Sequence, residues 1–210
     1  RLPRAILGLA VGAALGLAGA AMQGFLRNPL AEPGLIGTTS AAALGAVIAI
    51  HTGLYAAFAL ALPLMALAGA AVAVGLILAL AGPRGRALSL ILAGIAISAL
   101  MGALTALALN LAPSPYAATE IVFWMMGSLA DRSMQHVWLA LPFLGLGAAL
   151  LAATARGLDA LTLGEDAAES LGVSLTALRL QIVFGTAALV GAATAVAGAV
   201  GFVGLVVPHL

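Results

Sequence analysis

Runs of about 20 apolar residues recur along this sequence, and short polar stretches separate them. A helix rises about 1.5 Å per residue, so a run of about 20 residues crosses the ~30 Å hydrocarbon layer of a bilayer. Hydrophobic residues make up 64% of the chain and charged residues only 7%, which is too little polar surface for a soluble domain. We therefore predict an all-α polytopic membrane protein, with spans at 5–26, 35–50 (a short one), 56–81, 88–112, 137–153 and 180–200 and another helix beginning near residue 203.

The arginines of the connecting loops fall on alternate sides of this predicted bundle. One side carries Arg1, Arg4 and Arg132, and the other carries Arg27, Arg84, Arg86, Arg156 and Arg179. Basic residues are enriched in cytoplasmic loops, so the second side is predicted to be cytoplasmic and residues 51–55 and 113–136 to face outward. Within 113–136 the stretch IVFWMMGSLA is too short to span, which indicates a short interfacial or re-entrant helix.

Two stretches match each other at an offset of 179 residues: VGAALGLAGAAMQGFLRNP (11–29) and VGAATAVAGAVGFVGLVVP (190–208). Chance matching of Gly and Ala is the alternative explanation. A true repeat at this offset spans an odd number of predicted helices, so its copies cross in opposite senses, as in the inverted repeats of many transporters.

An inverted five-helix repeat predicts about ten membrane helices in the full-length protein. Residues 1–210 would then be a single permease domain truncated at both ends, lacking the first helix and the C-terminal helices. A start without methionine and an end within an apolar run agree with this expectation.

Residues 156–179 read RGLDALTLGEDAAESLGVSLTALR and concentrate the charge of the chain. GEDAAESLG has acids in its first turn and Gly172 after its last, which predicts a short helix, and Ser174 is a candidate cap for the next one. A solvated loop is the simpler explanation, but a loop of this size with its own helices is usually functional. An apolar face, which needs a partner protein, would be formed by Leu161, Leu163, Ala167, Ala168 and Leu171.

Several kinds of chemistry are excluded by the residues that the chain lacks. It has no cysteine and no lysine, so it has no thiolate metal site and no P-loop lysine for ATP. No G-x-S-x-G occurs, and His51, His136 and His209 are far apart, so we expect neither an enzyme nor a resident metal or cofactor. The predicted spans hold essentially no ionisable residue, and Gln23 and Asn110 are their strongest polar groups.

Energy for transport would then enter through an ATPase bound at residues 156–179. An ion-coupled secondary transporter without an ATPase is the alternative, and a non-transporting membrane scaffold is a third possibility.

Five stretches of the sequence together resemble a known family: RLPR (1–4), GAALGLAGAAMQGFLRNPLAEPGLIG, FWMMGSLA, LGEDAAESLGV and GFVGLVVPHL. They are similar to the permease subunit of the iron-complex and cobalamin ABC importers, the type II, FecCD-like family. The resemblance implies ten helices per subunit and a homodimer around a central path in the bacterial inner membrane. It also implies two cytoplasmic ATPase subunits and a periplasmic or lipoprotein substrate-binding protein as partners.

The resemblance also implies two gating elements and a docking site. Asn28, Pro29 and Leu30 match a turn that helps to form a cytoplasmic gate. A second constriction matches Ala87 and Leu88, where some relatives carry small hydroxyl residues and this chain does not. Outward arginines that pair with glutamates of the binding protein match Arg1 and Arg4. Arginine binds carboxylates in a bidentate manner, which suits this role, and anchoring at the membrane boundary is the alternative.

The acidic helix at 164–171 matches the coupling helix that docks into the ATPase. Leu171 is expected to fill an apolar pocket there, with acidic residues at the rim. The residues implied in coupling are Gly164, Glu165, Asp166, Glu169, Leu171 and Gly172.

An iron or cobalt complex is the implied cargo. Haem is the first expectation, because AEPGLIG and residues 185–210 have a general likeness to haem-type members. Ferric siderophores and cobalamin come next. The glycine-rich, apolar spans hold nothing that would ligate iron specifically.

Overall fold

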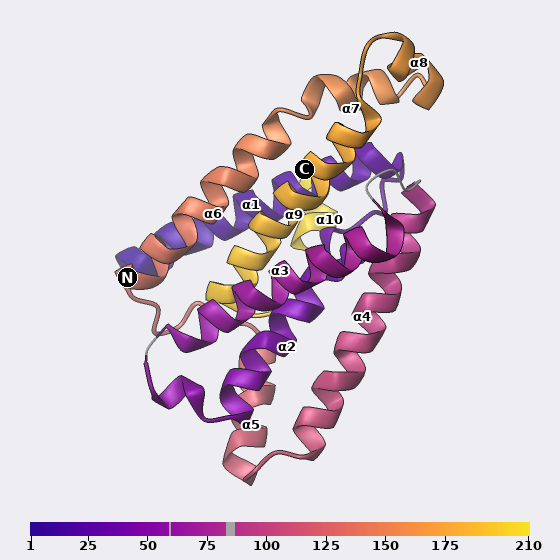
Figure 1. Ribbon diagram of the computed structural model, residues 1–210. Coiled ribbons are helices and arrows are strands. Elements are labelled where there is room, and N and C mark those ends of the chain that lie inside the picture. The colour runs from indigo at the N-terminus through magenta and orange to yellow at the C-terminus, as the bar shows by residue number, and fades with distance from the viewer. Residues whose placement is uncertain (59, 83–86) are drawn as a thin grey trace.

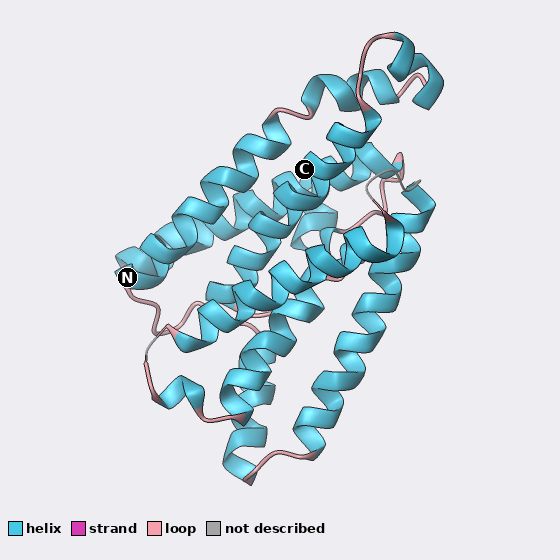
Figure 2. Ribbon diagram, in the orientation of Figure 1, coloured by secondary structure: helices cyan, strands magenta, loops and turns pink. Residues whose placement is uncertain are grey.

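The structure is a computed structural model that describes residues 1–58, 60–82 and 87–210, and every regular element in these ranges is a helix (Figure 2). Five helices are long and apolar enough to cross a membrane, which confirms the predicted all-helical membrane class. They are α1 (Leu2–Leu26), α3 (Ala61–Ala81), α4 (Ala87–Asn110), α6 (Met134–Ala152) and α9 (Leu175–Ala197). Arg84 and Arg86, expected in a cytoplasmic loop, lie outside the described residues.

The central helix is α9, which packs against α1, α3 and α6 (Figure 1). In its most apolar window 78% of the residues are buried, the largest share among the five long helices. Its start is set by Ser174, whose side chain accepts a hydrogen bond from the Ala177 N–H at 3.4 Å, as predicted. It ends at Gly198, where φ is 80°, a conformation that glycine adopts without steric cost.

The predicted span at 35–50 is wrong, because Gly37 interrupts it with a φ of 75°. A short 3₁₀ turn, η1 (Pro33–Ile36), precedes Gly37, and α2 (Thr38–His51) follows it. Its 14 residues measure only about 21 Å at 1.5 Å per residue, too short to span. The predicted helix at 56–81 begins later, after η2 (Leu54–Ala56), and the helix predicted at 180–200 begins earlier, at Leu175.

Three short helices, α5, α7 and α8, lie at the two ends of the bundle (Figure 1). α7 (Ala155–Leu161) and α8 (Glu165–Ser170) project at one end, here called the α8 end, near the last turn of α1. The opposite end carries α5 (Pro115–Met125), the short helix expected between residues 113 and 136. Its start is capped by Ser114, which accepts a hydrogen bond from the Ala117 N–H at 3.2 Å.

The helix predicted from residue 203 does begin there, but α10 (Val203–Val206) has four residues and passes into η3 (Val207–His209). α9 ends at Ala197, 171 residues after the end of α1 at Leu26, so the sequence offset of 179 does not align the two helix ends. The offset of 179 residues came from matching Gly and Ala residues inside the two helices. The end of each helix is determined instead by the residue that follows it, Arg27 after α1 and Gly198 after α9. Both long helices are followed by an irregular stretch and a short helix, η1 after α1 and α10 after α9.

Candidate functional site

Two interruptions of the helical bundle lie against each other. The first break is residues 27–37, between α1 and α2, and the second break is residues 198–209, after α9. They are far apart in the sequence. The motif Q-G-x-x-x-N-P-L-A-x-P (23–33) runs from the last turn of α1 into the first break, and G-F-V-G-L-x-x-P-H (201–209) lies within the second. Their contact is the structural feature that the sequence did not predict.

The first break is a tight turn built by its own side chains. Arg27 adopts the left-handed conformation at φ 48°, ψ 40°, which ends α1. The Asn28 side-chain oxygen then accepts a hydrogen bond from the Leu30 N–H at 2.9 Å, a usual role for asparagine in turns. Pro29 cannot continue a helix. As a result the Leu30 side chain is 75% exposed, whereas Ala31 is fully buried.

Three hydrogen bonds connect the two motifs. Gln23 Nε2 donates to the Leu205 carbonyl at 3.1 Å, and Glu32 Oε1 accepts from the Phe202 N–H at 2.9 Å. His209 Nε2 lies 3.0 Å from the Pro29 carbonyl, which can only accept, so this nitrogen carries the proton. Gln23 was noticed in the sequence as a polar group within a span, but nothing in the sequence paired it with Leu205.

Close backbone approach also holds the breaks in place. A β-carbon at Gly204 would lie 2.6 Å from the Pro33 ring, and one at Gly94 of α4 would overlap the Leu35 carbonyl. Glycine is therefore required where the breaks meet each other and where the first break enters the bundle beside α4.

The second expected gating element lies at the first turn of α4. Leu88 is 64% exposed and Ala87 is half-buried. The first break approaches α4 at Gly94, roughly two turns further along the helix. The structure thus brings the first break and α4 together, but deeper in the bundle than Ala87 and Leu88.

The expected coupling segment, residues 156–179, runs into the start of α9, and one of its acids is paired there. Arg179 of α9 lies 3.4 Å from Glu165 Oε1, although Glu165 was expected only as a rim contact to a partner. The predicted single apolar face is also divided. Leu161 and Ala168 are buried against the bundle, whereas Leu163 and Leu171 are 70% and 65% exposed. Gly164 and Gly172 flank α8 with φ values of 108° and 85°.

The other expected coupling residues stay accessible on α8. Asp166 and Glu169 are exposed. Asp166 directly follows Glu165, and Glu169 lies two residues before Leu171. The α8 end therefore presents two exposed leucines beside two exposed carboxylates.

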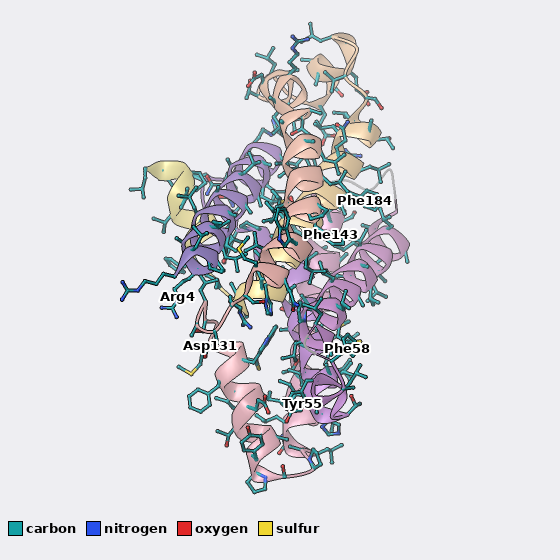
Figure 3. All side chains as sticks on the ribbon, turned by 90° about the vertical axis from the view of Figure 1, so that its left-hand side faces the viewer. Arg4, Tyr55, Phe58, Asp131, Phe143 and Phe184 are labelled. Carbon is teal, nitrogen blue, oxygen red and sulfur yellow. The ribbon has the colours of Figure 1, made fainter. Side chains whose placement is uncertain are left out.

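At the opposite end, Arg1 and Arg4 begin α1 and are both exposed. Figure 3 shows the Arg4 side chain extending away from the bundle. Arg132, which was expected on the same side, is instead partly buried and donates to the Ser128 carbonyl at 3.4 Å. Burial lowers the pKa of Arg132, and the Asp131 carboxylate acts in the opposite direction.

Near α5, Tyr55 of η2 lies close to a carboxylate. The Glu120 side chain raises the pKa of Tyr55.

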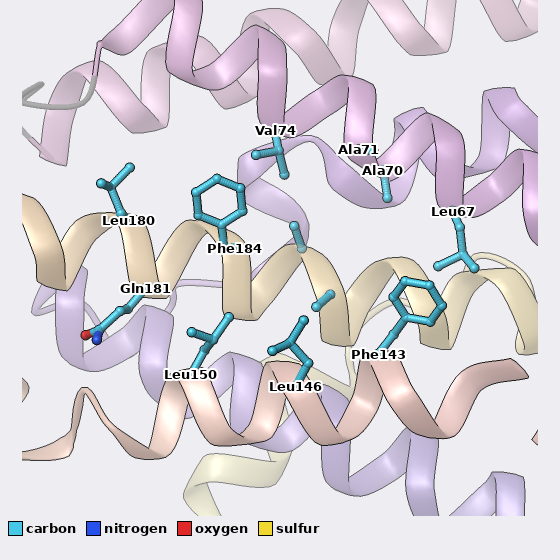
Figure 4. A pocket seen from close by; sticks show the side chains of 12 residues that line it. Leu67, Ala70, Ala71, Val74, Phe143, Leu146, Leu150, Leu180, Gln181 and Phe184 are labelled. Carbon is cyan, nitrogen blue, oxygen red and sulfur yellow. The ribbon is translucent and has the colours of Figure 1, made fainter. Parts of the chain in front are cut away.

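An apolar groove of about 420 Å³ runs between α3, α6 and α9 (Figure 4). Leu67, Phe143 and Phe184 are among the side chains that line it, and among the described residues Gln181 is the one polar lining residue. Such a lining suits hydrocarbon and offers no ligand for a metal. Among the described residues no group of three or more His, Asp or Glu side chains is placed to hold a metal ion.

A model of the FecCD transport family matches residues 1–210, the whole chain. The chain belongs to the FecCD transport family. This finding confirms the resemblance predicted from the sequence. It makes the chain part of a multi-pass protein of the cell membrane.

Individual relatives of this FecCD chain are also transport proteins. It is 40% identical over 215 residues to the uncharacterized ABC transporter permease protein YvrB of Bacillus subtilis, and covers 60% of that protein. It is 39% identical over 212 residues to the cobalamin import system permease protein BtuC of Halobacterium salinarum, and covers 56% of it. To the vitamin B12 import system permease protein BtuC of Salmonella typhi the identity is 37% over 210 residues, with 64% of that protein covered.

A solved structure has the same fold. This FecCD chain superposes, over its full length and 66% of the other chain, on an ABC transporter in an inward-facing conformation described as of the metal-chelate type. The TM-score is 0.91 and the sequence identity 34%. The chain thus spans between 56% and 66% of the length of these similar proteins.

Proposed function

We propose that this chain forms most of the permease subunit of an ATP-driven importer that carries a metal chelate across the cell membrane. The observation that carries the proposal is the superposition, with a TM-score of 0.91, on a transporter described as of the metal-chelate type. The similar proteins named for cobalamin and vitamin B12 import support a large chelate as cargo. Haem, ferric siderophores and cobalamin are the candidate cargoes, and the sequence favours haem only by general likeness.

The first break is proposed as a cytoplasmic gate. Its turn is fixed by Asn28, and it presents the exposed Leu30 beside the α8 end of the bundle. A leucine on a rigid turn closes an apolar path without binding a cargo specifically. Ala87 and Leu88, at the start of α4, would line the same opening as a second constriction in a homodimer.

The α8 end is proposed as the docking surface for two ATPase subunits. Its support is the pair of exposed leucines, Leu163 and Leu171, on a segment fixed to α9 by the ion pair between Glu165 and Arg179. Apolar anchors dominate protein interfaces, and rim charges such as Asp166 and Glu169 contribute little individually. Gly164 and Gly172 supply the two turns that present α8.

The opposite end is proposed to receive a substrate-binding protein through Arg1 and Arg4. Both side chains are exposed at the start of α1, so they can reach carboxylates of a partner without moving the helix.

A direct test uses the full-length subunit, reconstituted in proteoliposomes with its ATPase and binding protein. We expect ATP-dependent uptake of haem, a ferric siderophore or cyanocobalamin, and none with an ATPase that cannot hydrolyse ATP. Glu32, which lies beside α4, is the one observation that favours an ion-coupled transporter. Uptake driven by a proton gradient without ATP would establish that alternative and reject the proposal.

A further inference from the structure

The carbonyl of Pro29, in the turn of the first break, lacks the backbone partner that a helix would give it. In an α-helix this carbonyl would accept from the N–H of residue 33, but Pro33 has no N–H. Among the described residues no other backbone N–H bonds to it. The donor comes instead from His209 of the second break, whose Nε2 lies 3.0 Å away.

Two contacts with the second break bracket the exposed Leu30 side chain. The residue before it, Pro29, is bound by His209. Two residues after it, the Glu32 carboxylate accepts from the Phe202 N–H at 2.9 Å. The backbone that carries Leu30 is thus attached to the second break on both sides.

The turn also has hydrogen bonds of its own, but these fix only its shape. Asn28 accepts from the Leu30 N–H at 2.9 Å through its side chain and from the Ala31 N–H at 3.0 Å through its carbonyl. Both bonds lie within the turn, so they move with it as one piece. The place of the turn in the bundle is decided by its contacts with other segments, and the bond from His209 to Pro29 is the one next to Leu30.

The second break connects this turn to the far end of α9. α9 begins beside the coupling segment and ends near Trp124 of α5, at the opposite end of the bundle. The second break then returns along α1, where Gly204 lies against Gly19 and, beyond the end of α1, His209 lies against Pro29. One stretch of chain therefore leaves the coupling segment as α9 and comes back to the turn of the first break.

We propose that His209 is a positioning residue for the cytoplasmic gate. By holding the Pro29 carbonyl it sets where the Leu30 side chain stands, and it passes displacements of the second break to that turn. The inference rests on the proposed function and names the regulation of the same gate. Histidine suits the role because Nε2 carries a proton both in the neutral tautomer that this contact requires and in the charged ring, so the donor is always present.

Two amide substitutions of this histidine form a matched pair. The side-chain nitrogen of glutamine reaches about as far from the backbone as Nε2 of histidine, whereas that of asparagine reaches only as far as Nδ1. His209→Gln therefore keeps an N–H donor for the Pro29 carbonyl, and His209→Asn does not. Both amides are polar and the contact is exposed, so the two variants should melt at the same temperature.

The measurement is ATP hydrolysis without cargo by the full-length subunit, reconstituted in proteoliposomes with its ATPase and binding protein. Loss of one hydrogen bond shifts an equilibrium by roughly two- to tenfold. We expect His209→Asn to raise this uncoupled hydrolysis about threefold and His209→Gln to stay near the wild-type rate. A hydrogen bond that only stabilised the fold would change the melting temperature and leave the coupling intact.

A double variant tests whether His209 acts through the gate. If its role is to place the Leu30 side chain, removal of that side chain leaves it nothing to place. His209→Asn should then add no further uncoupled hydrolysis to that of Leu30→Ala, whereas two independent defects would multiply.

Three results would overturn this inference alone when Leu30→Ala itself raises uncoupled hydrolysis. The first is a wild-type rate in His209→Asn, the second is an equal rate in His209→Asn and His209→Gln, and the third is multiplied effects in the double variant. A wild-type rate in Leu30→Ala would instead overturn the proposed gate, and this inference with it. Absence of ATP-dependent uptake in the wild type would overturn the proposed function as a whole.

Discussion

Gly19 of α1 lies directly against the backbone carbonyl of Gly204 in α10, at a position where a β-carbon would overlap the carbonyl oxygen. One turn further along α1, Gln23 donates a hydrogen bond to the Leu205 carbonyl at 3.1 Å. These neighbouring contacts seat the second break on the face of α1. The two family motifs therefore fold as one unit, although they are far apart in the sequence.

Replacing Gly19 with alanine should destabilise the full-length protein, because α1 and the second break must separate to admit a methyl group. Overpacking of this kind costs about 1–3 kcal/mol. Gly12→Ala is the matched control, since no atom lies within 4 Å of a β-carbon at Gly12. It should be neutral or slightly stabilising, because alanine is the better helix former. Thermal unfolding in detergent measures both, and equal melting temperatures would show that the close approach imposes no constraint.

The ion pair between Glu165 and Arg179 should act on coupling rather than on stability. The Glu165 side chain is 42% exposed, whereas that of Arg179 is only 9% exposed, so the pair lies at the edge of the buried region. In Glu165→Gln the amide oxygen can still accept from the Arg179 guanidinium, so the melting temperature should fall only slightly. The cargo transported per ATP hydrolysed should fall more, because α8 is then less firmly oriented on α9. Asp166→Asn removes the neighbouring exposed charge and is the control. If the two variants give the same ratio of transport to hydrolysis, the ion pair does not orient α8.

The sequence predicted the elements whose signals are local. Apolar runs located the long helices, Ser174 marked the start of α9, and a short helix was expected where α5 lies. The prediction of a span at 35–50 was wrong because hydrophobicity does not reveal the backbone conformation of Gly37, whose positive φ interrupts the helix. Hydrophobicity alone cannot distinguish a continuous helix from a broken one.

The candidate site could not be predicted in the same way, because its contacts join distant segments. Glu32 was counted among loop charges, and only the fold brings it beside Ser98. Glu165 was expected to face a partner, whereas the return of the chain into α9 places Arg179 next to it. Motif resemblance indicated that both breaks matter, but it contained no information about how they are paired.

The exposed Leu30 side chain at the first break predicts that its removal lets ATP hydrolysis proceed without transport. Leu30→Ala removes an apolar plug from a turn that Asn28 keeps in shape, so ATP hydrolysis without cargo should rise in proteoliposomes. Leu9→Ala is the control, because Leu9 is 81% exposed on α1 away from the break. Leu88→Ala tests the second constriction in the same assay. Normal coupling and no leak in Leu30→Ala would argue against a gate at this turn.

The two arginines at the start of α1 predict a salt-dependent contact with the binding protein. Changing both Arg1 and Arg4 to glutamate should weaken its association and reverse the salt dependence of the affinity, because added salt then screens a repulsion instead of an attraction. Basal ATP hydrolysis should persist. Changing both to lysine keeps the charge and should have a smaller effect. An unchanged affinity in the glutamate variant would identify these residues as boundary anchors only.

The coupling segment yields the strongest prediction. In the proposed importer, force from ATP hydrolysis enters through the contact between the ATPase and the α8 end. α8 is short, ends at an exposed Leu171, and is joined to α9 by only a few residues, so movement of a partner passes to α9 with little loss.

Leu171→Asp should therefore release the ATPase during purification and abolish uptake. Loss of a buried interface anchor costs about 2 kcal/mol or more, which is roughly a 30-fold loss of affinity. The substitution should not unfold the membrane domain, because the Leu171 side chain is 65% exposed in the isolated chain. Glu169→Gln, on the same helix, removes a rim charge and should be mild. Co-purification of the ATPase, measured beside uptake and size-exclusion behaviour, separates these effects. A Leu171→Asp complex that stays intact and transports normally would exclude α8 as the coupling element.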